Sequence, residues 1–157
     1  MSVKIRLVRV DSRLLHATVA LNWNSFVNAN FIAVVDPAHT DDPFFTKVMK
    51  LSFPDNHRVE FFSVEDLIEF INTPREEETL NLMIVFENVH ALRQAIDLGL
   101  KVKEVQFPYP ASRYLLKRLD DYFSPTEVQD IRAIQKKKVK LYFQTAPYDT
   151  KEYSVFK

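Results

Sequence analysis

Residues 11–16, DSRLLH, bring several reactive side chains together directly after an apolar run. An acid (Asp11), a hydroxyl (Ser12) and a guanidinium (Arg13) precede the imidazole of His16. An imidazole can act as a general base, a metal ligand or a nucleophile. Asp11 is the one carboxylate nearby, and no second histidine stands four residues from His16, so the residues give little support to a metal site.

A nucleophilic histidine that accepts a phosphoryl group needs a free ring nitrogen, an acceptor for its other N–H, and donors for the transferred dianion. Ser12, Arg13 and Thr18 carry such donors, and Asp11 can orient the ring or hold Arg13. A helix start at this point would add unpaired backbone amides and a favourable dipole. On residue types alone, a histidine that caps or packs at a helix start is the commoner case, and an active His16 is the alternative.

Elements that could position these groups follow from the hydrophobic pattern. Short runs rich in Val, Ile and Phe alternate with longer segments of helical spacing, which is typical of βαβ units. The pattern predicts a single α/β domain over residues 1–157, with a central, mainly parallel sheet of about six to seven strands flanked by helices in three layers. The expected strands cover residues 5–10, 31–35, 59–62, 82–86, 103–107 and 140–144. Ligands of such sheets bind outside the carboxyl ends of the strands, so residues 11–16 lie where a site is expected.

Start and stop signals predict where the helices lie. The first is expected to begin at residues 14–16 and to end before Asn28, and the second to span residues 43–51. Ser63 with Asp66, and Ser124 with Glu127, have the spacing of a capping box. Gly99 is expected to end the helix over residues 89–98 in a left-handed conformation.

Composition excludes several classes of protein. Gly99 is the only glycine, so the glycine-rich phosphate loops are absent and a nucleotide-binding α/β enzyme is disfavoured. With 21 basic and 21 acidic residues there is no bulk field to attract nucleic acid, and we expect no nucleic-acid partner. The chain has no cysteine. We expect no metal or other cofactor, and the lack of a signal peptide or membrane-spanning apolar run predicts a cytoplasmic protein.

Residues 9–19, RVDSRLLHATV, resemble a known signature. Enzyme IIB of the mannose/fructose/sorbose family of the sugar phosphotransferase system (PTS) typically reads R-I-D-D-R-L-I-H-G-Q-V at this point. The similarity continues through Trp23, the second expected strand, Pro54, residues 63–65 and 97–100, and residues 124–127. It covers nearly the whole chain.

The resemblance implies a phosphoryl carrier. His16, through Nδ1, would accept the phosphoryl group of a phosphohistidine on a IIA domain and pass it to a sugar entering through the membrane IIC/IID pair, which would hold the protein at the membrane surface. Asp11 and Arg13 are expected to share in catalysis. The expected phosphate-binding residues are Arg9, Ser12, Ala17, Thr18, Tyr109, Ser112 and Arg113. The sugar and the oligomeric state are left open.

Two stretches depart from the family pattern. Ala17 and Thr18 replace Gly-Gln after the histidine, and Ser12 replaces the second aspartate. After the fifth strand, residues 106–113 read QFPYPASR where the family has a glycine-rich loop, so the loop is expected to be stiffer and to offer fewer amides. We interpret this as an active-site rim remodelled for a different IIA partner or sugar system. A divergent surface turn, or a noncatalytic or regulatory IIB-like paralogue, is the alternative.

Overall fold

The computed structural model describes residues 3–12, 27–38, 40–51, 58–74, 79–110 and 112–157. The first predicted helix falls almost wholly outside these ranges. At its end, Val27 is helical and Asn28 has a φ of 55°, in agreement with the predicted end of the helix.

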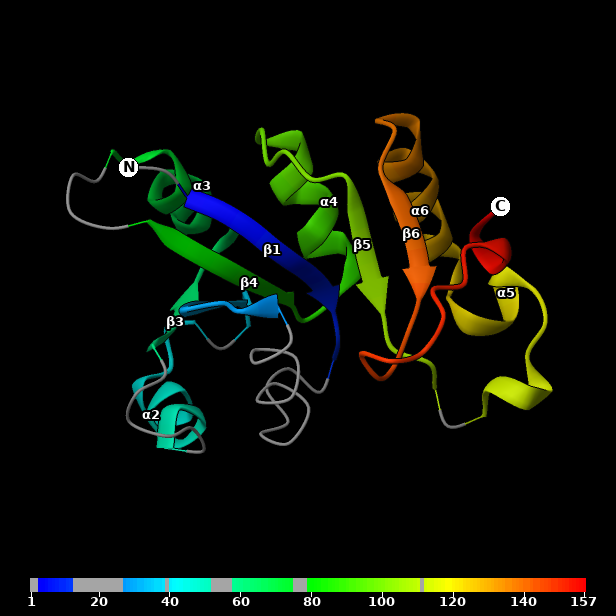
Figure 1. Ribbon diagram of the computed structural model, residues 1–157, viewed down its shortest axis with the longest axis horizontal. Helices are drawn as coiled ribbons and strands as arrows, with labels where there is room; N and C mark the ends of the chain where they lie inside the picture. The colour runs from blue at the N-terminus through cyan, green and yellow to red at the C-terminus, as the bar shows by residue number, and fades with distance from the viewer. Residues whose placement is uncertain (1–2, 13–26, 39, 52–57, 75–78, 111) are drawn as a thin grey trace.

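Six parallel strands form one sheet in the order β3-β2-β4-β1-β5-β6 (Figure 1). The sequence predicts about six to seven strands, and the described residues form six. Beyond them, the described residues make one isolated antiparallel bridge, between Phe143 and Glu152. The strands are β1 (Val3–Val10), β2 (Phe31–Val35), β3 (Arg58–Phe62), β4 (Leu80–Phe86), β5 (Glu104–Phe107) and β6 (Lys140–Phe143). Each contains or nearly matches a predicted run, which confirms the α/β class.

The strand order creates a switch point between β1 and β5. These two strands are neighbours, with Arg9 opposite Gln106. From β1 the chain goes on to β2, toward the edge formed by β3. From β5 it goes on to β6, which forms the opposite edge. Connections that diverge in this way leave a crevice at the carboxyl ends of the two strands, which is where open α/β sheets bind ligands.

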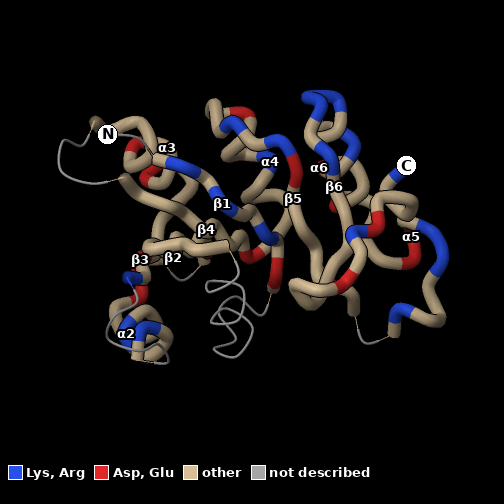
Figure 2. Tube along the Cα trace, viewed as in Figure 1, with Lys and Arg blue, Asp and Glu red and all other residues tan. Residues whose placement is uncertain are grey.

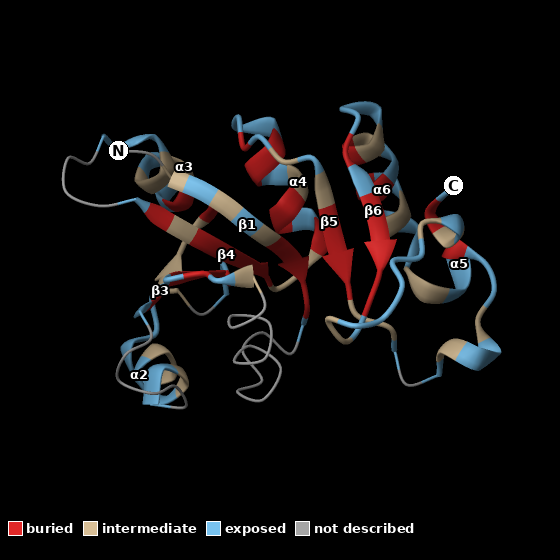
Figure 3. Cartoon of the chain, viewed as in Figure 1, coloured by how far each residue is buried: buried red, intermediate tan, exposed pale blue. Residues whose placement is uncertain are grey.

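Helices cover both faces of the sheet, as Figure 1 shows. Alternate residues of β2 separate the two cores: Phe31 and Ala33 belong to the larger one, Ile32 and Val34 to the smaller one. Buried residues of α3 (Val64–Asn72), α4 (Val89–Asp97) and α6 (Pro125–Lys136) join the larger core, and α2 (Pro43–Leu51) packs on the smaller one. Figure 3 shows the buried strands between these layers. In the parts of the chain that the structure describes, no helix is long and apolar enough to cross a membrane.

The helix signals predicted at Ser63, Gly99 and Ser124 are found in the structure, although at Ser63 only the serine half of the capping box is formed. The hydroxyl of Ser63 accepts from the amide of Asp66 at 3.1 Å and caps α3. Ser124 and Glu127 form a capping box at the start of α6, with reciprocal bonds of 3.2 and 2.9 Å. Gly99 has a φ of +110°, a backbone conformation that would be strained for a residue with a side chain. The short helices η1 (Arg113–Leu115), α5 (Leu119–Tyr122) and η2 (Ser154–Phe156) were not predicted, because so few residues carry no detectable period.

Candidate active site

A pocket of about 580 Å³ opens at the carboxyl ends of β1, β4, β5 and β6, beside the switch point. Asp11 and Ser12 contribute from the end of β1, and Tyr109 from the loop after β5. Glu87 and Asn88 line it after β4, at the start of α4. The further lining residues are Val10, Val89, Phe107, Pro108, Pro110, Tyr122, Phe123, Glu127 and Phe143. The pocket therefore has the position that the strand pattern predicts for a site.

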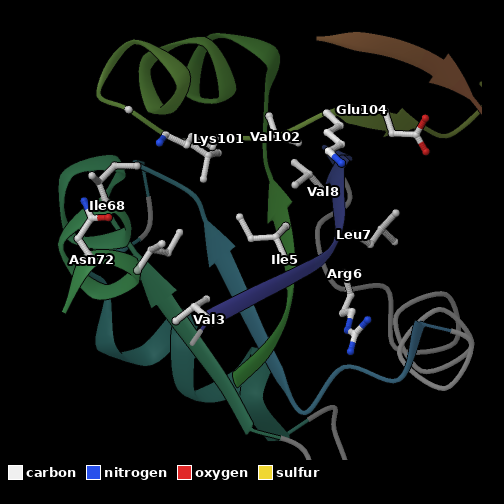
Figure 4. Close-up of a pocket in the computed structure, with 14 residues that line it drawn as sticks. Val3, Ile5, Arg6, Leu7, Val8, Ile68, Asn72, Lys101, Val102 and Glu104 are labelled. Atoms are coloured by element: carbon white, nitrogen blue, oxygen red, sulfur yellow. The ribbon is translucent and has the colours of Figure 1, made fainter. Parts of the chain in front are cut away.

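A second pocket, of about 570 Å³, lies beside the amino half of β1 (Figure 4). Its walls mix apolar side chains such as Val3 and Ile68 with polar ones such as Arg6, Lys101 and Glu104. None of the predicted site residues that the structure describes lines it. It is at the wrong end of the sheet for the chemistry expected of residues 11–16.

Arg9 and Asp11 form a buried ion pair at the end of β1. Arg9 is 1% exposed, and its Nε and Nη2 atoms donate to Oδ2 of Asp11 at 3.3 and 3.0 Å. Arg9 is on β1 and Asp11 follows the strand by one residue, so the two-residue spacing puts both side chains on the same side of the chain. The amide of Asp11 donates to the carbonyl of Phe86 at 2.9 Å, which ties the backbone of Asp11 to the end of β4. The carboxylate of Asp11 is thus held in a defined position at the pocket.

Two buried glutamines continue from this ion pair. Nη1 of Arg9 donates to Oε1 of Gln106 at 2.8 Å, and Nε2 of Gln106 donates to Oε1 of Gln144 at 3.1 Å. Gln144 in turn donates to the carbonyl of Asp149 at 2.8 Å. Sequence reasoning missed both glutamines. The signal available was a glutamine within or just after a strand whose neighbours are apolar.

Tyr109 is the one residue predicted from the 106–113 loop that lines the pocket. Its hydroxyl donates to the carboxylate of Glu152, and its amide donates to the hydroxyl of Thr145 at 3.1 Å. Its ring stacks on Phe143 with 4.8 Å between centroids. Burial and the carboxylate of Glu152 raise the pKa of Tyr109 well above the ordinary value of a tyrosine. These contacts hold the proline-containing loop against β6 and the chain that follows it.

Ser112 and Arg113 lie away from the lining of this pocket. The guanidinium of Arg113 is 4.6 Å from the ring centroid of Tyr109 and lies also over Tyr114, to whose hydroxyl it donates at 2.9 Å. Arg113 lines a neighbouring hollow with Tyr109. The carbonyl of Ser112 accepts from the amide of Leu115 at 2.9 Å and opens η1.

Arg13, His16, Ala17 and Thr18 lie outside the described residues. Arg13 follows Ser12 directly, so the chain enters this stretch from the wall of the pocket. The described residues of the wall contribute three carboxyl groups, from Asp11, Glu87 and Glu127, and no lysine or arginine. Of these, Asp11 is compensated by Arg9. No group of three or more His, Asp or Glu in the described chain could hold a metal ion.

Residues 5–154 match the family model of the PTS system sorbose subfamily IIB component. The chain belongs to this family. Among its relatives, the N-acetylgalactosamine-specific phosphotransferase enzyme IIB component 1 of Escherichia coli is 25% identical over 154 residues, covering 96% of each chain. The sorbose-specific EIIB component of Klebsiella pneumoniae is 25% identical over 142 residues, covering 88% of this chain and 85% of the relative.

Solved structures have the same fold. The crystal structure of the E. coli N-acetylgalactosamine-specific IIB component 1 has a TM-score of 0.80 and 24% identity, covering 95% of this chain and 98% of that one. The IIBSor domain of the K. pneumoniae sorbose permease has a TM-score of 0.81 and 23% identity, covering 97% and 94%. As a IIB component, the protein is a phosphotransferase that carries a phosphoryl group in PTS sugar uptake.

Proposed function

We propose that His16 carries the phosphoryl group and that the pocket at the carboxyl end of β1 is the transfer site. The observation behind this is the buried Arg9–Asp11 pair, which holds the first part of the RVDSRLLH signature at the pocket. His16 is four residues beyond Ser12, so covalent geometry keeps the two Cα atoms within about 14 Å of each other. Asp11 is in a position to orient the imidazole or to hold Arg13.

We assign Arg13 to balance the negative charge of the transferred phosphoryl group. A phosphoryl group in transfer carries negative charge on three oxygens, and the described wall of the pocket supplies no cation to balance it. Arg13 would provide paired donors, and the hydroxyls of Ser12 and Thr18 with the backbone amides near Ala17 would complete the cradle. Arg9 is buried against Asp11 and Gln106, and we therefore assign it to positioning Asp11.

The transfer has two steps. In the first, the bond from phosphorus to the donor imidazole of a IIA domain breaks as Nδ1 of His16 bonds to phosphorus. In the second, a sugar hydroxyl displaces His16 from phosphorus, and its proton passes to the released imidazole. The protein positions the reacting groups and balances their charge. The high transfer potential of phosphohistidine drives the transfer to the sugar.

The partners follow from these two steps. We infer a IIA domain as donor and a membrane IIC/IID pair through which the sugar arrives, with this protein on the cytoplasmic side. A donor domain would approach the pocket beside Tyr109, which lines both this pocket and the neighbouring hollow that Arg113 lines. We interpret the proline-containing loop after β5 as an active-site rim remodelled for a different IIA partner or sugar system.

Labelling with phosphoenolpyruvate tests the assignment. The chain is incubated with radiolabelled phosphoenolpyruvate, the two general PTS phosphotransfer proteins and a IIA domain. We expect an acid-labile phosphoprotein and expect His16→Ala to abolish it. His90→Ala, at a 62% exposed side chain on α4, is the matched control and should label normally. Label that persists in His16→Ala, or no label with any IIA domain, would contradict the proposal.

A further inference from the structure

The glutamine relay, defined as Arg9, Gln106, Gln144 and the carbonyl of Asp149, runs across three neighbouring strands. Arg9 is on β1, Gln106 on β5, and Gln144 directly follows β6 (Figure 1). Arg9, Gln106 and Gln144 are 1%, 0% and 5% exposed. Burying polar side chains costs free energy unless each one finds a partner, and the three bonds of the relay provide partners in sequence.

The chemistry of Arg9 sets the direction of every bond in the relay. A guanidinium can only donate, so Gln106 must turn its oxygen to Arg9 and its amide nitrogen to Gln144. Gln144 must then accept through its oxygen and donate through its nitrogen to the carbonyl of Asp149. No amide can flip without breaking two bonds. The relay therefore holds the guanidinium of Arg9, and Arg9 in turn holds the carboxylate of Asp11.

The far end of the relay is itself a closed turn. The amide of Asp149 donates to the carbonyl of Ala146 at 3.0 Å, and the carboxylate of Asp149 accepts from the amide of Ala146 at 2.9 Å. The neighbouring Thr145 accepts from the amide of Tyr109, which lines the pocket. The segment from Gln144 to Asp149 thus contacts the pocket by two routes, through Tyr109 and through the relay.

Stability alone does not account for the relay. Apolar side chains of similar volume can replace buried ionic groups at no loss of stability, or at a gain. Here the guanidinium and two amides of the relay are buried together with the carboxylate of Asp11, and of these groups only Asp11 lines the pocket. In many active sites, buried polar residues hydrogen-bond to the groups that contact the substrate and orient them. Arg9, Gln106 and Gln144 have the same arrangement behind Asp11.

We propose that Gln106 and Gln144 are positioning residues for phosphoryl transfer, which hold the Asp11 carboxylate through Arg9. The inference rests on the proposed function of residues 11–16. Neither glutamine touches the transferred group. Their substitution should slow the transfer step while leaving the docking of the donor domain unchanged.

Two nearly isosteric variants test the relay. Gln106→Glu keeps an acceptor for Arg9 but sets a carboxylate oxygen against Gln144 and makes Arg9 serve two carboxylates. Gln144→Glu keeps the acceptor for Gln106 but sets an oxygen against the carbonyl of Asp149. Gln129→Glu, an exposed position on α6, makes the same change of charge without a buried contact and is the control.

The readout is the rate of phosphorylation by a phospho-IIA domain over a range of its concentration. We expect Gln106→Glu to lower the saturating rate on the order of 10-fold and Gln144→Glu about 3-fold, since losing an outer partner misplaces the inner group without removing it. The half-saturating concentration should stay within about twofold, because uniform binding is untouched. Gln129→Glu should match the wild type in both constants.

Circular dichroism on the same samples separates positioning from folding. Wild-type rates in the folded glutamine variants would overturn the proposal. So would a loss of rate equal to the loss of folded protein, because that assigns the relay a purely structural role. The proposed function fails by a different result, namely wild-type protein that is not labelled on His16, whatever the glutamine variants do.

Discussion

Nη2 of Arg9 lies 3.0 Å from Oδ2 of Asp11, with both side chains almost completely withdrawn from solvent. Arg9, near the end of the central strand β1, and Asp11, directly after that strand, bring opposite charges together in the protein interior at the wall of a pocket. The pair is neutral as a whole, so the field that a phosphoryl group meets depends on the residues that follow. Three predictions depend on this ion pair, on Arg13 and on Tyr109 in the loop after β5.

The first concerns the stability of the ion pair. Arg9→Met removes one partner and leaves the carboxylate of Asp11 buried beside an apolar side chain. We expect a loss of about 3–5 kcal/mol in the free energy of unfolding, the usual cost of removing one partner of a buried ion pair. Denaturant unfolding followed by circular dichroism measures it. Arg6→Met, at an exposed position of the same strand, is the control and should cost less than about 1 kcal/mol. Equal losses at the two positions would refute the importance of the buried pair.

The second concerns Arg13 as the cation of the transfer site. Arg13→Ala should lower the rate of phosphoryl transfer about 100-fold, the typical effect of removing a donor aimed at developing charge. Arg13→Lys should restore part of the rate, since it returns the charge but not the paired donors. Stopped-flow or rapid-quench transfer from a phospho-IIA domain provides the measurement.

Lys101→Ala makes the same change of charge at an exposed position near the amino ends of the strands. It should transfer at the wild-type rate. A similar slowing in Lys101→Ala and Arg13→Ala would point to overall charge and away from a specific cradle.

The third concerns Tyr109, whose pKa is raised by burial and by the carboxylate of Glu152. In the unfolded chain its phenol ionises near pH 10, whereas in the folded chain it keeps its proton to higher pH. The contribution to stability is therefore complete below about pH 10 and is lost as pH rises above it, because the unfolded state then binds fewer protons. Between pH 8 and pH 11 the melting temperature of the wild type should fall further than that of Tyr109→Phe.

Tyr148→Phe, at a side chain that is 92% exposed, is the matched control for this measurement. We expect it to reproduce the pH dependence of the wild type. If Tyr109→Phe also reproduces the wild-type pH dependence, ionisation of Tyr109 makes no contribution to the fall of the melting temperature at alkaline pH.

Local patterns predicted much of the fold. The run FIAVV is β2 with the predicted bounds, and residues 43–51 are α2. Ser124 and Glu127 make the predicted capping box, because a cap depends on residues three apart in the chain. The position of a site after β1 was also predictable, since the carboxyl ends of parallel strands meet at one edge.

The amino-acid sequence by itself determined the strands, the longer described helices and the reactive signature at residues 9–16, because propensity, periodicity and capping act over a few residues. Only the tertiary structure decided the order of the strands, and with it the partners of Arg9. Gln106 is 97 residues from Arg9, and Gln144 is 38 residues further along the chain. They meet because β1, β5 and β6 are adjacent in the sheet, and Tyr109 meets Glu152 because the chain turns back after β6. Such contacts depend on the packing of the whole chain, which no local pattern contains.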